Sequence, residues 1–185
     1  MWLIDLVENL LSVTRIEEGR MQIRQSAELV DEVIKEALKH TGQSRTGRTI
    51  KVEEEDELIL AKMDARLIVQ VLINLIGNAV KYTPQGTDIT VRVKKEKAEN
   101  AERSQVIISV CDLGNGIPDD RKERVFDMFY TGSDQVADSR RSLGLGLGLC
   151  RSIINAHGGK IWISDNIPHG AVVTVSYTHL TLPTN

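Results

Sequence analysis

Two glycine-rich segments constrain this chain more than any other part of its sequence. The first, at 112–118, reads Asp-Leu-Gly-Asn-Gly-Ile-Pro and directly follows an apolar run at 106–110 that is typical of a buried strand. The second has glycines at 144, 146 and 148, where a helix over 145–156 is expected to begin. Glycine lets a backbone approach a ligand closely, and N–H groups at a helix start can bind phosphate oxygens.

Taken singly, each glycine segment has an ordinary explanation. Asp112 can accept a hydrogen bond from an exocyclic amine such as that of adenine, but an Asx hydrogen bond within a tight turn explains it equally well. The second segment lacks the preceding strand and the Lys-Ser/Thr ending of a P-loop, and no strand leads into it as in a dinucleotide fingerprint.

A helix expected over 64–82, capped by Asp64 and ended by Pro84, carries two asparagines on one face. Asn74 and Asn78 are four residues apart among apolar neighbours, so both amides need partners. An amide oxygen can bind Mg²⁺ beside phosphate oxygens, and Lys81 can reach a phosphate. The alternative, two asparagines that hydrogen-bond to a neighbouring loop, stays open.

The order of the other elements predicts a two-layer α/β sandwich with a mixed sheet and helices on one face. We expect a helix over 27–40 with Ser26 as its N-cap, charged turn residues at 94–104, a mobile loop at 131–143, and a helix stop at Gly158 and Gly159. The expected strands are a hairpin of 49–54 with 58–62, the strand 88–93, and a last hairpin of 160–164 with 171–176.

Composition excludes some functions. The net charge is −3, and no Lys/Arg cluster interleaves with aromatics, so nucleic acid is not an expected partner. Cys111 and Cys150 lie in apolar segments and read as small buried hydrophobes in a reducing compartment. No stretch is long and apolar enough to span a membrane, and the N-terminus does not resemble a signal peptide.

In their order and spacing, these segments resemble the N, G1, F and G2 boxes of the histidine-kinase ATP-binding domain. This is the Bergerat fold shared with gyrase B, Hsp90 and MutL. The four matching stretches read QVLINLIGNAVKYTP, DLGNGIP, RVFDMFY and SLGLGLGLCRSIINAHGG, within about 26–175. The combination with CRSIINAHGG is most similar to potassium-sensing kinases of the KdpD type. Ser142 departs from the pattern, which usually has a glycine there.

The resemblance implies the site residues. Asn78 is the Mg²⁺ ligand, Asp112 contacts the adenine amine, 131–143 is the ATP lid, and Asn74, Asn78 and Lys81 form the catalytic set. The implied ATP-binding residues are Asn78, Lys81, Tyr82, Asp112, Gly114, Gly116, Ile117, Phe129, Gly144, Leu145, Gly146 and Leu147. Arg124, Phe126 and Phe129 are expected mainly to pack, and partly to anchor the lid.

The resemblance also divides the chain. Residues 1–19 read as an amphipathic helix, either packed on its own domain or left from a truncated dimerisation bundle, whose second helix they resemble. Residues 20–176 are the ATP-binding catalytic domain, and 177–185 are a tail of uncertain origin. No histidine has the context of the phosphoacceptor: not His40, His157, His169 or His179. The chain is therefore expected to be inactive in autophosphorylation by itself.

Three functions remain to be weighed. As a histidine kinase domain, the chain passes the γ-phosphoryl of ATP to a histidine of the same or a partner protomer, for relay to a response regulator. The parent protein would be a membrane-anchored homodimer with this domain in the cytoplasm. A hydrolytic Bergerat ATPase carries, by resemblance, a glutamate at position 74, where this chain has an amide that cannot act as a base. The third is a nucleotide-binding regulatory module without turnover.

Overall fold

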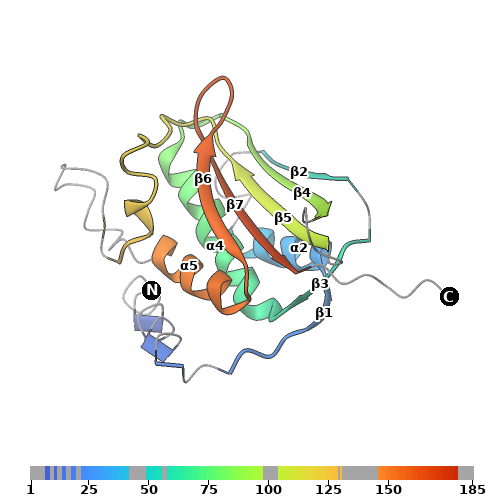
Figure 1. Cartoon of the computed structure of the whole chain (residues 1–185). Coiled ribbons are helices and arrows are strands. Elements are labelled where there is room, and N and C mark those ends of the chain that lie inside the picture. The colour runs from blue at the N-terminus through green and yellow to red at the C-terminus, as the bar shows by residue number, and fades with distance from the viewer. Residues whose placement is uncertain are drawn as a thin grey trace.

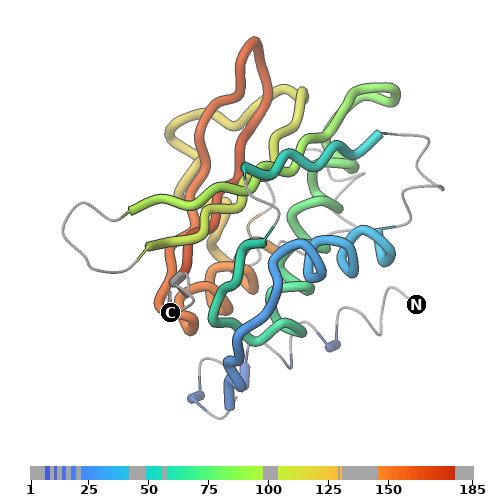
Figure 2. Tube along the Cα trace, turned by 90° about the vertical axis from the view of Figure 1, so that its right-hand side faces the viewer, coloured from blue at the N-terminus to red at the C-terminus, as the bar shows by residue number. Residues whose placement is uncertain are grey.

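The computed structural model describes residues 22–41, 49–55, 58–97, 104–128, 130 and 146–178, with 7–8, 11, 14–15 and 18–19 near the N-terminus. A five-stranded sheet has the order β2-β4-β5-β7-β6, in which only β2 and β4 run parallel. The helices gather on one face of this sheet (Figures 1 and 2). The expected two-layer α/β sandwich with a mixed sheet is confirmed.

The elements have the following bounds. The large sheet contains β2 (Ile50–Glu54), β4 (Ile89–Lys97), β5 (Ser104–Cys111), β6 (Lys160–Asp165) and β7 (Ala171–Thr178). A two-stranded antiparallel sheet pairs β1 (Ser26–Leu29) with β3 (Leu60–Met63). The helices are α2 (Val30–Thr41), α4 (Ala65–Tyr82), α5 (Gly146–Ala156) and the short 3₁₀ helix η1 (Arg124–Phe126).

The core lies between α4 and the sheet. Helix α4 buries an apolar face that includes Leu72 and Ile76, both fully buried. Opposite it, alternate residues of β4 point inward, so Val91 is buried while Arg92 is exposed. This burial makes α4 a fixed support for the polar groups along its free side.

The expected helix ends are confirmed. The Asp64 carboxylate accepts a hydrogen bond from the Leu67 N–H at 3.4 Å and so caps α4. After the C-terminal end of α5, Gly158 has a φ of +70°, and the Gly159 N–H donates to the Ile154 carbonyl at 2.9 Å. Both cysteines are buried and free, as expected.

Two predictions, one for a helix start and one for a hairpin, were wrong. Ser26 is not an N-cap, because 26–29 pair with β3 and the helix begins only at Val30. Residues 49–54 and 58–62 do not form a hairpin, since β2 pairs in parallel with β4 and β3 belongs to the small sheet. Alternation marks a strand but does not identify its partner, and only the parallel pairing brings buried Ile50 beside Ile89.

The prediction of a charged turn at 94–104 was also partly wrong. Strand β4 continues to Lys97 and β5 begins at Ser104, so the ladder extends through the pair Lys97 with Ser104. One face of an antiparallel ladder can be solvated, and charged side chains therefore do not end it. Residues 98–103 lie outside the described part of the chain.

The ends of the chain are described only in part. In the predicted N-terminal helix, 7, 8, 11, 14 and 15 are helical and exposed, and Gly19 has a φ of +64°, as expected of a helix stop. Strand β7 runs to Thr178, two residues past the predicted boundary at 176, and 179–185 are outside the described residues. In the described part of the chain, no helix is long and apolar enough to cross a bilayer.

Candidate functional site

The residues expected to bind ATP converge on α4 from two directions. A Cβ added to Gly146, the first residue of α5, would lie 3.5 Å from the Asn74 Oδ1 atom. A Cβ added to Gly114 would lie 2.8 Å from the carbonyl oxygen of Tyr82, the last residue of α4. The start of α5 therefore meets the middle of α4, and the turn after β5 meets its C-terminal end, so that Asn78 lies between the two contacts along the helix. Figure 1 shows α4 and α5 side by side.

Asp112 follows β5 directly and is held by backbone donors. Its Oδ1 atom accepts hydrogen bonds from the Gly114 N–H at 2.8 Å and the Ala171 N–H at 3.1 Å. Within the described residues, both bonds go to this one oxygen, which leaves Oδ2 for a ligand. The Asx turn and the ligand contact, posed as alternatives from the sequence, are therefore compatible.

The turn between β6 and β7 supports this site, and sequence reasoning missed it. The Asn166 Nδ2 atom donates to the Asp112 carbonyl at 2.7 Å, and the His169 Nδ1 atom lies 3.0 Å from the Gly114 carbonyl. Gly170 has a φ of +108°, and a Cβ there would lie 2.1 Å from the Asp112 carbonyl oxygen. The only available signal was an Asn and a Gly at a hairpin turn, which are typical of any hairpin.

Asn74 lies beside α5, with its Oδ1 atom facing the start of that helix at Gly146. The nearby Asn74 amide lowers the pKa of the Cys150 thiol. Burial has the larger effect and raises the pKa of Cys150 to about 12. The Cys150 thiol itself donates to the Val71 carbonyl of α4, with a separation of 3.7 Å. The hydrogen bond from the neutral Cys150 thiol to the Val71 carbonyl holds the first turns of α5 against the middle of α4.

Asn78 is half-buried, one helical turn beyond Asn74. No hydrogen bond within the described residues engages its amide, so its oxygen can bind a ligand. In the described part of the chain, no group of three acidic, His or Cys side chains is arranged to hold a metal ion. One amide oxygen fits Mg²⁺ that arrives with phosphate and water as its other ligands, because Mg²⁺ is usually bound through few protein groups.

Lys81 and Tyr82 end α4 on its exposed side. The Lys81 Nζ atom lies 5.1 Å from the centroid of the Tyr82 ring, within the range of a cation–π contact. Both side chains are exposed, with Tyr82 59% accessible. This leaves the Lys81 ammonium able to contact a phosphate without breaking a buried ion pair.

The other predicted residues divide into packed, exposed and undescribed ones. Ile117 is half-buried against Phe126, Ile163 and Ala171, and Gly116 has a φ of +72°. Leu147 of α5 packs on the core. Phe129, Gly144, Leu145, Ser142 and the predicted lid at 131–143 lie outside the described residues.

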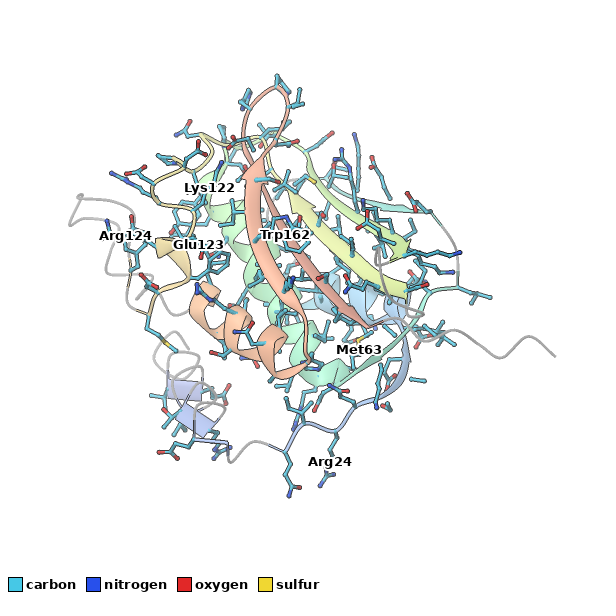
Figure 3. The ribbon with its side chains drawn as sticks, in the orientation of Figure 1. Arg24, Met63, Lys122, Glu123, Arg124 and Trp162 are labelled. Atoms are coloured by element: carbon cyan, nitrogen blue, oxygen red, sulfur yellow. The ribbon has the colours of Figure 1, made fainter. Side chains whose placement is uncertain are left out.

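The segment between the two glycine regions is anchored at several points. Lys122 Nζ lies 2.9 Å from an Asp165 carboxylate oxygen at the end of β6. Phe126 is buried under the Arg151 guanidinium, and the Arg124 guanidinium lies 5.1 Å from the Tyr130 ring centroid. Figure 3 shows Lys122, Glu123 and Arg124 on this segment beside β6. The expected packing role of Phe126 is confirmed.

Known proteins share the sequence pattern and the fold of this chain. Residues 63–182 match the family described as "Histidine kinase-, DNA gyrase B-, and HSP90-like ATPase". The chain is 41% identical over 171 residues to sensor protein KdpD of Clostridium acetobutylicum, an alignment that covers 92% of this chain and 18% of that protein. It therefore spans about a fifth of that relative.

Solved structures share the fold. The catalytic domain of histidine kinase ThkA superposes with a TM-score of 0.68 at 30% identity, covering 85% of this chain and 96% of that domain. A second structure, histidine kinase ThkA in complex with response regulator protein TrrA, gives a TM-score of 0.71 at 27% identity and covers 96% of this chain and 49% of that one. Both alignments cover most of this chain.

Proposed function

This chain belongs to the family of histidine kinase-, DNA gyrase B- and HSP90-like ATPases, and we propose that it is the ATP-binding catalytic domain of a two-component sensor histidine kinase. It holds ATP and donates the γ-phosphoryl group to a histidine outside this chain, from which a response regulator receives it. The similarity to KdpD and to ThkA supports this member of the family over the gyrase and HSP90 branches.

The observation that carries the proposal is the amide at position 74. Asn74 lies one turn before Asn78 and faces Gly146 at the start of α5. A hydrolytic enzyme needs a base here to activate water, and an amide does not accept a proton at neutral pH. A phosphoacceptor histidine brings its own nucleophile, so transfer to a protein group requires no such base from this helix.

The other residues bind and orient the nucleotide. The Asp112 Oδ2 atom accepts a hydrogen bond from the adenine amine, and the backbone at Gly114 and Gly116 approaches the base. Asn78 would hold Mg²⁺, which when bound neutralises phosphate charge, and Lys81 contacts a phosphate oxygen. Because phosphoryl transfer needs little covalent participation by the protein, positioning and charge neutralisation supply most of the catalysis.

The partners follow from the same proposal. The phosphoacceptor helix of the same or a partner protomer must reach the open side of the site. The complex of ThkA with response regulator TrrA supports a response regulator as the next acceptor. KdpD is named a sensor protein, which supports a sensor parent; we propose a membrane-anchored homodimer with this domain in the cytoplasm and residues 1–19 as part of its bundle.

Phosphotransfer to an added acceptor tests the proposal. This chain is mixed with a separate helical bundle that carries a phosphoacceptor histidine, γ-labelled ATP and Mg²⁺, and acid-labile label on the bundle is measured. We expect label with the wild-type chain and none with Asp112→Ala. Release of inorganic phosphate without phosphohistidine would favour the ATPase, and Mg²⁺–ATP binding with neither product would favour the regulatory module.

A further inference from the structure

The ends of α4 and α5 farthest from the proposed nucleotide site are joined by a buried hydrogen bond. The Asp64 N–H donates to the His157 Nε2 atom at 3.0 Å, across 93 residues of sequence. Both residues are almost fully buried, with exposures of 5% and 7%. Asp64 begins α4 and His157 directly follows α5, so one bond connects the two helices that carry the site residues.

The hydrogen bonds of His157 define its tautomer. A backbone N–H can only donate, so Nε2 must present its lone pair to Asp64. The Nδ1 atom lies 2.7 Å from the Ile153 carbonyl and must therefore carry the proton and donate it. The imidazole is neutral and uses both nitrogens inside the protein, which is typical of a ring held in one orientation.

Residues 22–25, which precede β1, also contact Asp64. The Arg24 N–H donates to the Asp64 Oδ2 atom at 3.2 Å, while the Ile23 side chain packs on the core. Two residues later β1 begins, and its pairing of Ser26 with Met63 fixes the chain beside Asp64. Figure 3 shows Arg24 at the same end of the domain as Met63. The entering segment is thus bonded to the cap of α4.

The two helices meet again near the site. Gly146, at the start of α5, faces Asn74 of α4, whereas His157, after its end, faces Asp64. The helices are therefore antiparallel, and the two contacts are separated by about 15 Å, ten residues at a helical rise of 1.5 Å each. Two contacts on a close-packed helix pair transmit a displacement at one end to the other, because packed helices shift as units.

We propose that Asp64 and His157 are positioning residues that connect segment 22–25 to the two helices. Through them, this segment sets the placement of α4 relative to α5. That placement determines the distance between Asn78 and the start of α5. This inference rests on the proposed function only for its consequence, which is a change in Mg²⁺–ATP affinity. The mechanical coupling of segment 22–25 to the start of α5 is a property of the fold, and amide resonances measure it without any nucleotide.

The first test removes one backbone donor. Arg24→Pro deletes the N–H that binds Asp64 and leaves the β1 ladder intact, whereas Arg24→Ala keeps the N–H and removes only the side chain. In the nucleotide-free chain, we expect the amide resonances of Gly146 and Leu147 to shift in Arg24→Pro and not in Arg24→Ala. Calorimetry should then show about fivefold weaker Mg²⁺–ATP binding for Arg24→Pro, the lower end of typical coupling between sites.

The second test changes the imidazole. His157→Gln keeps an acceptor near the Nε2 position and should bind Mg²⁺–ATP as wild type does, whereas His157→Leu should bind roughly tenfold more weakly. Nitrogen-15 resonances of the wild-type ring should show a protonated Nδ1 and an unprotonated Nε2. The opposite tautomer, or unchanged Gly146 and Leu147 resonances in Arg24→Pro, would overturn the inference. Absence of Mg²⁺–ATP binding by the wild-type chain would instead overturn the proposed function, and the resonances would still decide the coupling.

Discussion

The side-chain amide of Asn166 donates a 2.7 Å hydrogen bond to the backbone carbonyl of Asp112, 54 residues earlier in the chain. The turn between β6 and β7 thereby holds the backbone of the residue proposed to recognise adenine. The N–H of Ala171, the first residue of β7, donates to the carboxylate oxygen Oδ1. The proposed ligand-binding oxygen is thus oriented before any ligand arrives, which lowers the entropy cost of binding.

Asn166→Ala tests this support. The Asn166 side chain donates to the Asp112 carbonyl and accepts from the Ile167 N–H at 2.9 Å, so loss of both hydrogen bonds should lower the free energy of unfolding by about 1–2 kcal/mol. Mg²⁺–ATP binding should weaken several-fold, because Asp112 loses a backbone anchor. Urea unfolding and calorimetry measure the two effects. Asn155→Ala, at an exposed position on α5, is the control and should lower neither the free energy of unfolding nor the affinity, because Ala favours a helix. An unchanged affinity in Asn166→Ala would show that the turn does not orient Asp112.

Asp112→Asn separates the structural role of the carboxylate from its ligand contact. The amide oxygen can still accept the Gly114 and Ala171 N–H groups, so the domain should fold. The Nδ2 group that replaces Oδ2 is a donor and opposes the donor of adenine, so ATP affinity should fall by at least roughly tenfold. Calorimetry with Mg²⁺–ATP measures this, with exposed Asp120→Asn as the control. Equal affinity in both variants would remove Asp112 from the proposed site.

Asn78→Ala tests the proposed Mg²⁺ ligand. If the Asn78 oxygen binds the metal, ATP affinity should fall by roughly tenfold in Mg²⁺, as is typical when a metal contact is lost. In EDTA, the wild type and the variant should bind ATP with equal, weak affinity. An equal loss in Mg²⁺ and in EDTA would show that Asn78 contacts the nucleotide itself or supports the fold.

Two glycine substitutions should have opposite effects on stability. In Gly114→Ala, the new Cβ would lie 2.8 Å from the Tyr82 carbonyl oxygen, so we expect a loss of about 1–3 kcal/mol. In Gly77→Ala, inside α4, the Cβ meets no described atom within 4 Å, and the free energy of unfolding should rise by about 0.5–1 kcal/mol. Urea unfolding of both variants decides, and a stabilised Gly114→Ala would contradict the close approach.

The buried thiol of Cys150 predicts a loss of stability at alkaline pH. Its pKa is raised from 9.0 to about 12, so the folded chain retains a proton that the unfolded chain releases. This stability is complete below pH 9 and declines as the pH rises towards 12, by at most about 1.4 kcal/mol per pH unit. Unfolding in urea between about pH 8 and pH 10 should show a smaller decline in Cys150→Ala than in wild type. An identical decline in both would contradict the prediction.

The sequence alone allowed much of the site to be predicted. The positions of Asn74 and Asn78 on one helix face, and of Asp112 at the end of a buried strand, follow from local periodicity. The helix caps at Asp64 and Gly158 also follow, because cap residues act over a few positions. The roles of Asn78, Lys81 and the glycines towards a nucleotide remain predictions that the experiments above address.

What lay beyond prediction was the pairing of distant segments. The sequence predicted a hairpin of two strands at 49–54 and 58–62, yet the strands observed there, β2 and β3, join different sheets. Residues 26–29 have a helical pattern but form a strand, since pairing with β3 satisfies their backbone groups. In each case a contact with a segment tens of residues away outweighs the local preference.

The sequence by itself determined which helices and strands form the core and which polar groups are carried on α4 and after β5, because hydrophobic periodicity and capping are local properties. Only the tertiary structure decided that Asn166 and Gly170 support Asp112, and that Arg24, Asp64 and His157 meet at one point. These contacts join residues 40 to 93 positions apart. Their partners are selected by the packing of α4 and α5 on the sheet, which no local pattern specifies.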